Sequence, residues 1–264
     1  MARILFVGDI MGSPGRRAVS KLLEGLRDSL GCDFVIVNGE NAAGGLGITR
    51  PTAGALFNAG ADVITMGNHT FAKRDVAPYF DEEPRIVRPA NYPPGVPGRG
   101  WGLYETRAGQ KIAVVSLAGR TYMEALDCPF RTGDAVLAEI GESAKMVFVD
   151  MHAEATSEKV ALGWHLDGRV SAVIGTHTHV QTSDERVLPN GTAYLTDAGM
   201  TGVRNSVLGL DCVAVIDRFV RQVPGKFTLA EGPARLQGAV VEVDPETGHA
   251  VSIERVVADE EASA

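Results

Sequence analysis

Two histidines separated by a single residue follow an apolar run in the second half of the chain. Residues 171–174 (Ser-Ala-Val-Ile) are typical of a buried strand, and His177 and His179 come shortly after it. Imidazole is an unusual end to a core strand, but it is a frequent ligand of transition metals. The pair therefore indicates a polar site at the carboxyl end of this strand.

Four more apolar runs end in side chains that can bind a metal ion. These side chains are Asp9, Glu40, Asn41, Asn68, His69, Asp150 and His152. Each has an ordinary explanation when taken alone, since Asp9 could cap a helix and His152 could be a hydrogen-bonded core histidine. In α/β sheets, however, the carboxyl ends of the strands form the edge where ligands bind. One shared site explains all five strand ends better than five independent coincidences.

The residue types favour a transition-metal site. Imidazole, carboxylate and amide oxygen together suit Mn, Fe or Zn better than Ca²⁺ or a thiolate-bound metal. The candidates exceed one coordination shell and are sufficient for two ions that share a bridging carboxylate: Asp9, Glu40, Asn41, Asn68, His152, His177 and His179. Two divalent ions outweigh the two carboxylates in charge, so such a centre attracts an anion, of which phosphate is the first choice. His165 and His249 are interpreted as structural.

The elements that position these residues alternate between short β-branched runs and amphipathic stretches, which predicts a layered α/β fold. Strands are expected at residues 3–7, 34–37, 62–66, 111–117, 145–149, 171–174 and 193–196, with helices at 14–30, 51–58 and 154–165. Antiparallel strands are expected at 213–216, 236–243 and 250–257. Residues 84–104 hold five prolines and are predicted to be irregular. We expect a single domain over residues 1–264 with two mixed sheets and a flexible tail at 258–264.

Composition narrows the function classes. The net charge of −8 argues against a broad surface that binds nucleic acid or anionic lipid. No stretch approaches the length of a membrane span. The three cysteines are far apart in the sequence and are expected to be reduced thiols of a cytoplasmic protein.

Several motifs resemble those of a known family. They are Gly8-Asp9, Asn38-Gly39-Glu40-Asn41, Gly67-Asn68-His69, His152 and Gly175-Thr176-His177-Thr178-His179. Together they resemble the calcineurin-like metallophosphoesterases, and most closely the YmdB-like branch, over nearly the whole chain. Met11 replaces a histidine that is usual in the wider superfamily, and Glu40 replaces a bridging aspartate. Both departures are features of the YmdB-like branch.

The resemblance implies a four-layer α/β/β/α sandwich and two divalent transition-metal ions, with Fe or Mn favoured over Zn. One ion would be held by Asp9, Glu40, Asn41 and His179. The other would be held by Glu40, Asn68, His152 and His177. The implied activity is that of a metal-dependent phosphoric ester hydrolase, a phosphodiesterase for 2′,3′-cyclic nucleotides that uses in-line attack of a metal-bridging hydroxide.

His69 is adjacent to a candidate ligand but is not itself assigned to a metal. Histidine exchanges protons near neutral pH, so we expect His69 to assist the leaving oxygen. The alternative is that it orients Asn68. The loops at 120–122 and 201–205 are candidates for contacts with the substrate.

Two other functions stay open from the sequence. One is a phosphomonoesterase, including a phosphoprotein phosphatase, and the other is a regulator that binds a nucleotide without turnover. The expected partner is a small phosphoester, and self-association into a homo-oligomer is left open.

Overall fold

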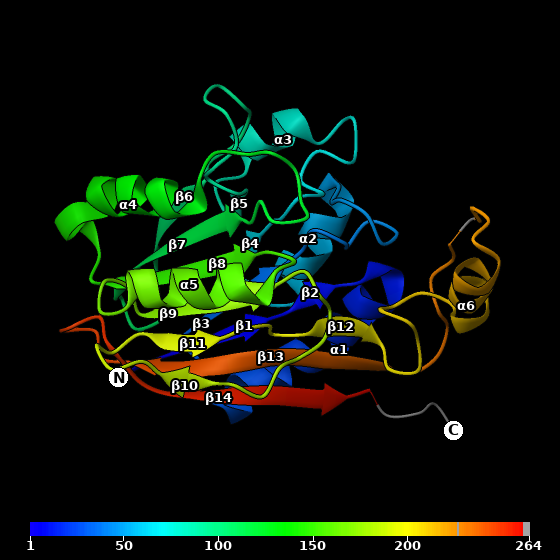
Figure 1. The fold of residues 1–264 in the computed structure, drawn as a ribbon. Coiled ribbons are helices and arrows are strands. Elements are labelled where there is room, and N and C mark those ends of the chain that lie inside the picture. Colours follow the sequence, from blue (N-terminus) through cyan, green and yellow to red (C-terminus); the bar gives the residue numbers. More distant parts are fainter. Residues whose placement is uncertain (226, 261–264) are drawn as a thin grey trace.

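The computed structural model describes residues 1–225 and 227–260, and these form two mixed sheets (Figure 1). The first sheet has the order β2-β12-β13-β1-β3-β4-β5, with β14 paired to β13. Its strands are β1 (Ala2–Val7), β2 (Asp9–Ile10), β3 (Phe34–Asn38), β4 (Val63–Thr65), β5 (Ile86–Val87), β12 (Met200–Val203), β13 (Ala234–Val243) and β14 (Ala250–Asp259). The second sheet has the order β10-β11-β9-β8-β7-β6. Its strands are β6 (Trp101–Glu105), β7 (Lys111–Ala118), β8 (Met146–His152), β9 (Ala172–Thr176), β10 (Arg186–Val187) and β11 (Ala193–Leu195).

The centre of each sheet is parallel, and this brings the predicted strand ends together. In the first sheet β1, β3, β4 and β5 run parallel, and in the second β7, β8, β9 and β11 do so. Strands β13, β14, β6 and β10 are antiparallel additions. Because parallel strands end at one edge, loops that are far apart in sequence meet there.

Three apolar layers hold the sheets and helices together. Between the sheets, Phe6 on β1 packs against Phe148 on β8, with ring centroids 5.1 Å apart. On the outer face of the first sheet, alternate residues such as Leu5 pack beneath α1 (Gly12–Ser29) and α2 (Arg50–Asn58). On the outer face of the second sheet lie α4 (Pro129–Ile140) and α5 (Thr156–Leu166). Each buried large side chain contributes about 1.5–3 kcal/mol. The predicted α/β/β/α sandwich is confirmed.

One buried carboxylate joins the two sheets beside the site edge. Asp150 on β8 accepts hydrogen bonds through Oδ2 from Asn38 Nδ2 of β3 (2.9 Å) and from the Thr65 hydroxyl of β4. Its Oδ1 accepts one from the Thr176 hydroxyl of β9 (2.6 Å). Burial raises the pKa of Asp150. These bonds fix the position of one sheet relative to the other.

Three predictions about elements need correction. Residues 213–216 are not a strand but lie in α6 (Cys212–Arg221). Val213, Ile216 and Val220 recur at helical spacing, and the Asp211 side chain caps the helix by accepting from Ala214 N (2.9 Å). Residues 84–104 are not irregular throughout, because they include β5 and most of β6. The helix α4, the short helix α3 (Ala77–Glu82), the 3₁₀ turn at Gly141–Ser143 and the short strands β2, β10 and β12 were not predicted.

The predicted tail at 258–264 begins too early. Ala258 and Asp259 pair with β13, and Glu260 binds Arg17 and Lys21 of α1. Residues 261–264 lie outside the described residues. Among the helices that the structure describes, none is long and apolar enough to cross a membrane.

Replacing Glu260 with glutamine is expected to destabilise the fold at neutral pH. The Glu260 carboxylate is 3.0 Å from Arg17 Nε and 2.6 Å from Lys21 Nζ, and it accepts a hydrogen bond from Ala234 N. Hydrogen bonds from Arg17 are the main cause that lowers the pKa of Glu260 to about 2. Because Arg17 and Lys21 are largely exposed, we expect a loss of only about 1 kcal/mol in the free energy of unfolding.

The sign of its pH dependence follows from the lowered pKa. The contribution of Glu260 is present above its unfolded-state pKa and is lost as the pH falls towards about 2. Urea unfolding between pH 3 and pH 7 should therefore show that the difference in free energy of unfolding between wild type and Glu260→Gln becomes smaller as the pH falls. The matched control is Glu254→Gln at an exposed position of β14. A difference in free energy of unfolding between wild type and Glu260→Gln that does not change with pH would contradict the stabilising role of the Glu260 carboxylate.

Candidate metal centre

The structure places the predicted residues at the carboxyl ends of strands from both sheets. Asp9 begins β2, while Glu40 and Asn41 follow β3 and Asn68 and His69 follow β4. In the second sheet His152 ends β8, and His177 and His179 follow β9. The site is therefore assembled from the two sheets at the edge beside Asp150.

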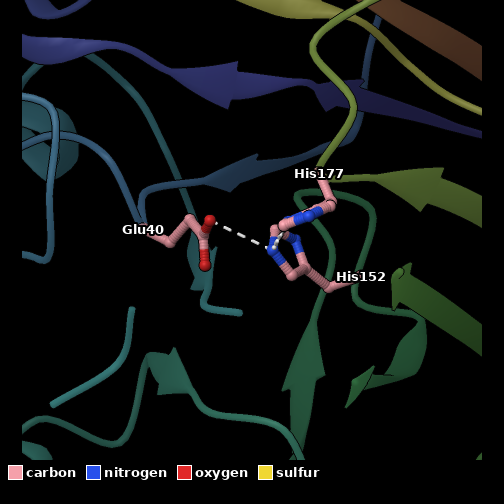
Figure 2. A group of neighbouring side chains, drawn as sticks. All are labelled: Glu40, His152 and His177. Atoms are coloured by element: carbon pink, nitrogen blue, oxygen red, sulfur yellow. Dashed lines mark hydrogen bonds and ion pairs between the residues drawn. The ribbon is translucent and has the colours of Figure 1, made fainter. Parts of the chain in front are cut away.

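Three of these residues form a compact cluster of donor atoms (Figure 2). One ligand atom each of Glu40, His152 and His177 lies within 4.8 Å of the others. His152 Nε2 is 3.0 Å from Glu40 Oε1 and 3.0 Å from His177 Nδ1. Asn68 Oδ1 is also 3.0 Å from the same nitrogen. A single nitrogen thus faces three potential ligand atoms.

The hydrogen bonds around His152 determine which of its nitrogens faces the cluster with a lone pair. The Thr176 hydroxyl donates its proton to Asp150, so it accepts from His152 Nδ1 at 2.8 Å. The neutral imidazole then carries its hydrogen on Nδ1 and presents the lone pair of Nε2. A hydrogen atom on Nε2 could serve only one of the three facing groups, whereas a cation could attract all three.

Asp9 and Asn41 each have a buried side-chain oxygen without a hydrogen-bond partner within the described residues. Asp9 is fully buried, and its Oδ2 accepts from the His177 backbone N at 3.1 Å. Asn41 Nδ2 donates to the Gly45 carbonyl at 3.1 Å. Within the described residues, Asp9 Oδ1 and Asn41 Oδ1 are buried without a hydrogen-bond partner. Such groups are costly unless they bind something, so both fit the role of metal ligands.

His179 lies next to Asp9, with its Nε2 3.9 Å from Asp9 Oδ1. The same Asp9 oxygen is 3.9 Å from His152 Nδ1. Asp9 Oδ1 is thus equally distant from His152 and His179. The division of the ligands into two groups stays a prediction.

Gly67 leaves the space that the donors surround. A Cβ at this position would lie 2.2 Å from Glu40 Oε2 and 2.3 Å from His152 Nε2. Any side chain would therefore occupy the volume between these ligands. This volume and the unpartnered oxygens show that the residues fit a metal centre.

Charges are strongly coupled in the cluster. Burial raises the pKa of Asp9 to about 6. Burial alone would also raise the pKa of Glu40, but its contact with His152 lowers that pKa to about 2. Burial opposes a charge on His152, but Glu40 and Asp9 raise its pKa to about 9. Burial and His152 lower the pKa of His177 to about 3, so His177 is neutral and able to bind a metal.

Metal binding at pH 7.5 is expected to release a proton. Because the metal-free His152 has a raised pKa of about 9, it is protonated at this pH and must lose that proton when Nε2 binds an ion. Titration calorimetry with Mn²⁺ in buffers of different ionisation enthalpy should report release of about one proton. The number of protons released should fall as the pH rises through about 9, because His152 is then already neutral before Mn²⁺ binds. An observed enthalpy that does not depend on the buffer would contradict this expectation.

The structure connects His69 to the site through its backbone. His69 N donates to Glu40 Oε2 at 3.2 Å, and the residue is partly exposed. Asn68, by contrast, is contacted by His152 through its side chain. Within the described residues no hydrogen bond joins the His69 ring to Asn68. The catalytic role of His69 stays a prediction.

Sequence reasoning missed residues that support the ligands. Glu154 Oε2 lies 3.2 Å from His177 Nε2 and so orients this imidazole. The sequence feature that could have identified Glu154 is an acidic residue two positions after His152. Asp197 accepts hydrogen bonds from Thr178, between the two histidines, and no local pattern in the sequence predicts that contact.

Comparison with known proteins places the chain in a family. The model of the family described as YmdB-like protein matches residues 5–256. The chain belongs to the YmdB-like family. This YmdB-like chain is 49% identical over 259 residues to the 2′,3′-cyclic-nucleotide 2′-phosphodiesterase of Bacillus subtilis, covering 98% of both chains. It is 35% identical to a putative phosphatase/phosphodiesterase of Mycoplasma pneumoniae, covering 98% of this chain and 94% of that protein.

Solved structures agree with this placement. A hypothetical protein from Thermus thermophilus superposes on the YmdB-like chain with a TM-score of 0.92 and 44% identity, covering 98% of this chain and 100% of that one. The calcineurin-like phosphoesterase YfkN from Bacillus subtilis gives a TM-score of 0.61 at 12% identity, covering 98% and 90%, which shows the shared fold. The predicted family and the predicted enzyme class, a phosphoric ester hydrolase of the metallophosphoesterase fold, are confirmed. The assignment of individual ligands stays a prediction.

Proposed function

We propose that this protein is a two-metal phosphodiesterase that hydrolyses 2′,3′-cyclic nucleotides. The observation that carries the proposal is His152 Nε2, which faces Glu40, Asn68 and His177 at 3.0 Å each beside the unpartnered oxygen of Asp9. The 49% identity to a 2′,3′-cyclic-nucleotide 2′-phosphodiesterase over 98% of the chain supports this choice of substrate.

The ligands divide between two ions. Asp9, Asn41 and His179 would hold one, Asn68, His152 and His177 would hold the other, and Glu40 would contact both. When bound, such a pair of ions activates water and stabilises negative charge at phosphorus. The mixture of imidazole, carboxylate and amide oxygen suits a transition metal, and Fe or Mn is the expected choice over Zn.

One residue is proposed to act on the phosphoester itself, and others support the ligands. His69 would donate a proton to the leaving oxygen, and its backbone bond to Glu40 holds it beside the ligands. Glu154 and Thr176 hold His177 and His152 in the required orientation. Burial of Asp9, Glu40 and His152 keeps bulk water away from the ligand atoms.

Two rim segments are proposed to select the nucleotide. Tyr122 is 90% exposed and could stack on a base. Its loop is anchored by Glu158, which accepts from Arg120 N and Thr121 N. A cavity of about 310 Å³ adjoins His179 and is lined in part by Gly202 and Arg204 of the second segment.

A substrate panel tests the proposal. Protein loaded with Mn²⁺ or Fe²⁺ would be assayed with 2′,3′-cyclic AMP, 3′,5′-cyclic AMP and a phosphopeptide. We expect preferential turnover of the 2′,3′-cyclic diester, and cleavage of its 2′ ester would leave the 3′-phosphate. Preferential hydrolysis of the phosphopeptide would instead identify a phosphomonoesterase, and tight nucleotide binding without product would identify a regulator. The cytoplasmic location and a homo-oligomer stay predictions.

A further inference from the structure

A buried ion pair contacts Thr178, the residue between His177 and His179. Lys159 on α5 and Asp197, two residues after β11, are 2.7 Å apart between Nζ and Oδ2. Both residues have an exposed fraction of 0%. Neither is among the ligands of the proposed metal centre, so this pair has no role in the proposed function as described above.

The Asp197 carboxylate is fully used as an acceptor. Its Oδ2 accepts from Lys159 Nζ, from the Thr178 backbone N (3.1 Å) and from the Thr178 hydroxyl (2.8 Å). Its Oδ1 accepts from Gly199 N at 2.8 Å. The Asp197 backbone also exchanges hydrogen bonds with Thr182, so Asp197 binds the chain on both sides of His179.

The segment that Asp197 holds has an unfavourable backbone. His177 has a φ of 98° and His179 a φ of 64°, and both lie in the left-handed region that residues with a Cβ avoid. Each such residue costs about 1–3 kcal/mol and persists only when its surroundings enforce it. Thr178, the residue between them, is fixed through both its backbone N and its hydroxyl. The hydrogen bonds from Thr178 to Asp197 therefore stabilise a strained backbone conformation, and this conformation directs both imidazoles towards the site.

The position of Asp197 is in turn determined by Lys159. A charged acceptor makes stronger hydrogen bonds than a neutral one, but a buried carboxylate requires a counter-charge. The fit around the lysine is tight, since a Cβ on Gly175 of β9 would lie 2.8 Å from Lys159 Cδ and 1.8 Å from the Thr196 carbonyl oxygen. Buried ion pairs contribute little net stability compared with apolar residues of similar size. The contribution of the Lys159–Asp197 pair is therefore to fix the position of the Asp197 carboxylate.

We propose that Asp197, anchored by Lys159, is a positioning residue that holds Thr178 and thereby places His177 and His179 for metal binding. The inference rests on the proposed function only in taking these histidines as ligands. Its consequence is that metal affinity depends on the Thr178 hydroxyl, which contacts no ligand atom in the cluster.

The experiment compares Thr178→Val with Thr178→Ser. Valine has nearly the shape of threonine but lacks the hydroxyl, whereas serine keeps it, and both leave the Lys159–Asp197 pair intact. The dissociation constant for Mn²⁺ is measured by competition with a chelator, and thermal unfolding of the metal-free proteins verifies that each variant folds. We expect Thr178→Val to weaken Mn²⁺ binding by about tenfold to a hundredfold. Thr178→Ser should keep the wild-type affinity.

The outcomes separate this inference from the proposed function. Wild-type affinity in Thr178→Val would overturn the positioning role, and so would an equal loss of affinity in Thr178→Ser. Because the readout is Mn²⁺ binding, it does not depend on a substrate. A wild-type protein that binds Mn²⁺ but hydrolyses no cyclic nucleotide would end the proposed function and leave this inference standing.

Discussion

Replacing Glu40 with glutamine is expected to reduce turnover of 2′,3′-cyclic AMP on the order of a thousandfold or more. Glu40 is the one residue proposed to contact both ions, and its Oε1 is 3.0 Å from His152 Nε2. The side chain is almost completely buried. Glutamine keeps its size but removes the negative charge, so two cations would meet across a neutral group. We expect the variant to hold fewer than two ions per chain after gel filtration, as measured by plasma mass spectrometry.

The control for Glu40→Gln is Glu260→Gln, which removes a carboxylate at the far end of the chain, where Arg17 and Lys21 bind it. It should lower stability while keeping metal content and turnover. A Glu40→Gln protein with two tightly bound ions and normal kcat would show that Glu40 does not bridge a metal pair.

Replacing His69 with alanine is expected to lower kcat by about 10²–10⁴-fold while both ions stay bound. The proposed role is proton donation to the leaving oxygen, and this acts in the transition state. KM should therefore change little compared with kcat. The backbone hydrogen bond from His69 N to Glu40 does not depend on the imidazole and should survive the substitution. Steady-state kinetics and metal analysis of the same preparation measure both effects.

A matched control is His165→Ala on α5. His165 Nε2 bonds to Asp134 of α4 at 2.9 Å, in the outer helix layer. Its loss should leave kcat unchanged. If His69→Ala instead lost metal and kcat together, the residue would have to be reassigned to support of the ligand Asn68.

The sequence was sufficient to select candidate site residues where a polar side chain follows the end of a strand. Asp9, Glu40, Asn68, His152 and His177 could be selected because buried parallel strands have easily recognised apolar runs, and a polar residue just after such a run is conspicuous. The resemblance of the motifs then supplied the four-layer arrangement, which alternation of elements alone does not determine.

Other features depend on tertiary contacts that no local pattern contains. Residues 213–216 are all apolar and three of them are β-branched, so they resemble a strand, but the Asp211 cap starts a helix there. The bond between Asp197 and Thr178 joins residues brought together by folding. The positive φ values at His177 and His179 likewise cannot be predicted from the sequence, because histidine, unlike glycine, does not favour a left-handed backbone.

The bonds that Asp150 makes to Asn38, Thr65 and Thr176 have a consequence for the precision of the whole centre. Slippage of one sheet across the other by a single residue would displace the two histidine-bearing strands by about 3.3 Å. That displacement is as large as the 3.0 Å between Glu40 and His152, so it would abolish the cluster. Neither the first ninety residues nor the last hundred and twenty hold all of the proposed ligands. Separately expressed fragments should therefore be unable to form the centre until the interface between the sheets has been rebuilt.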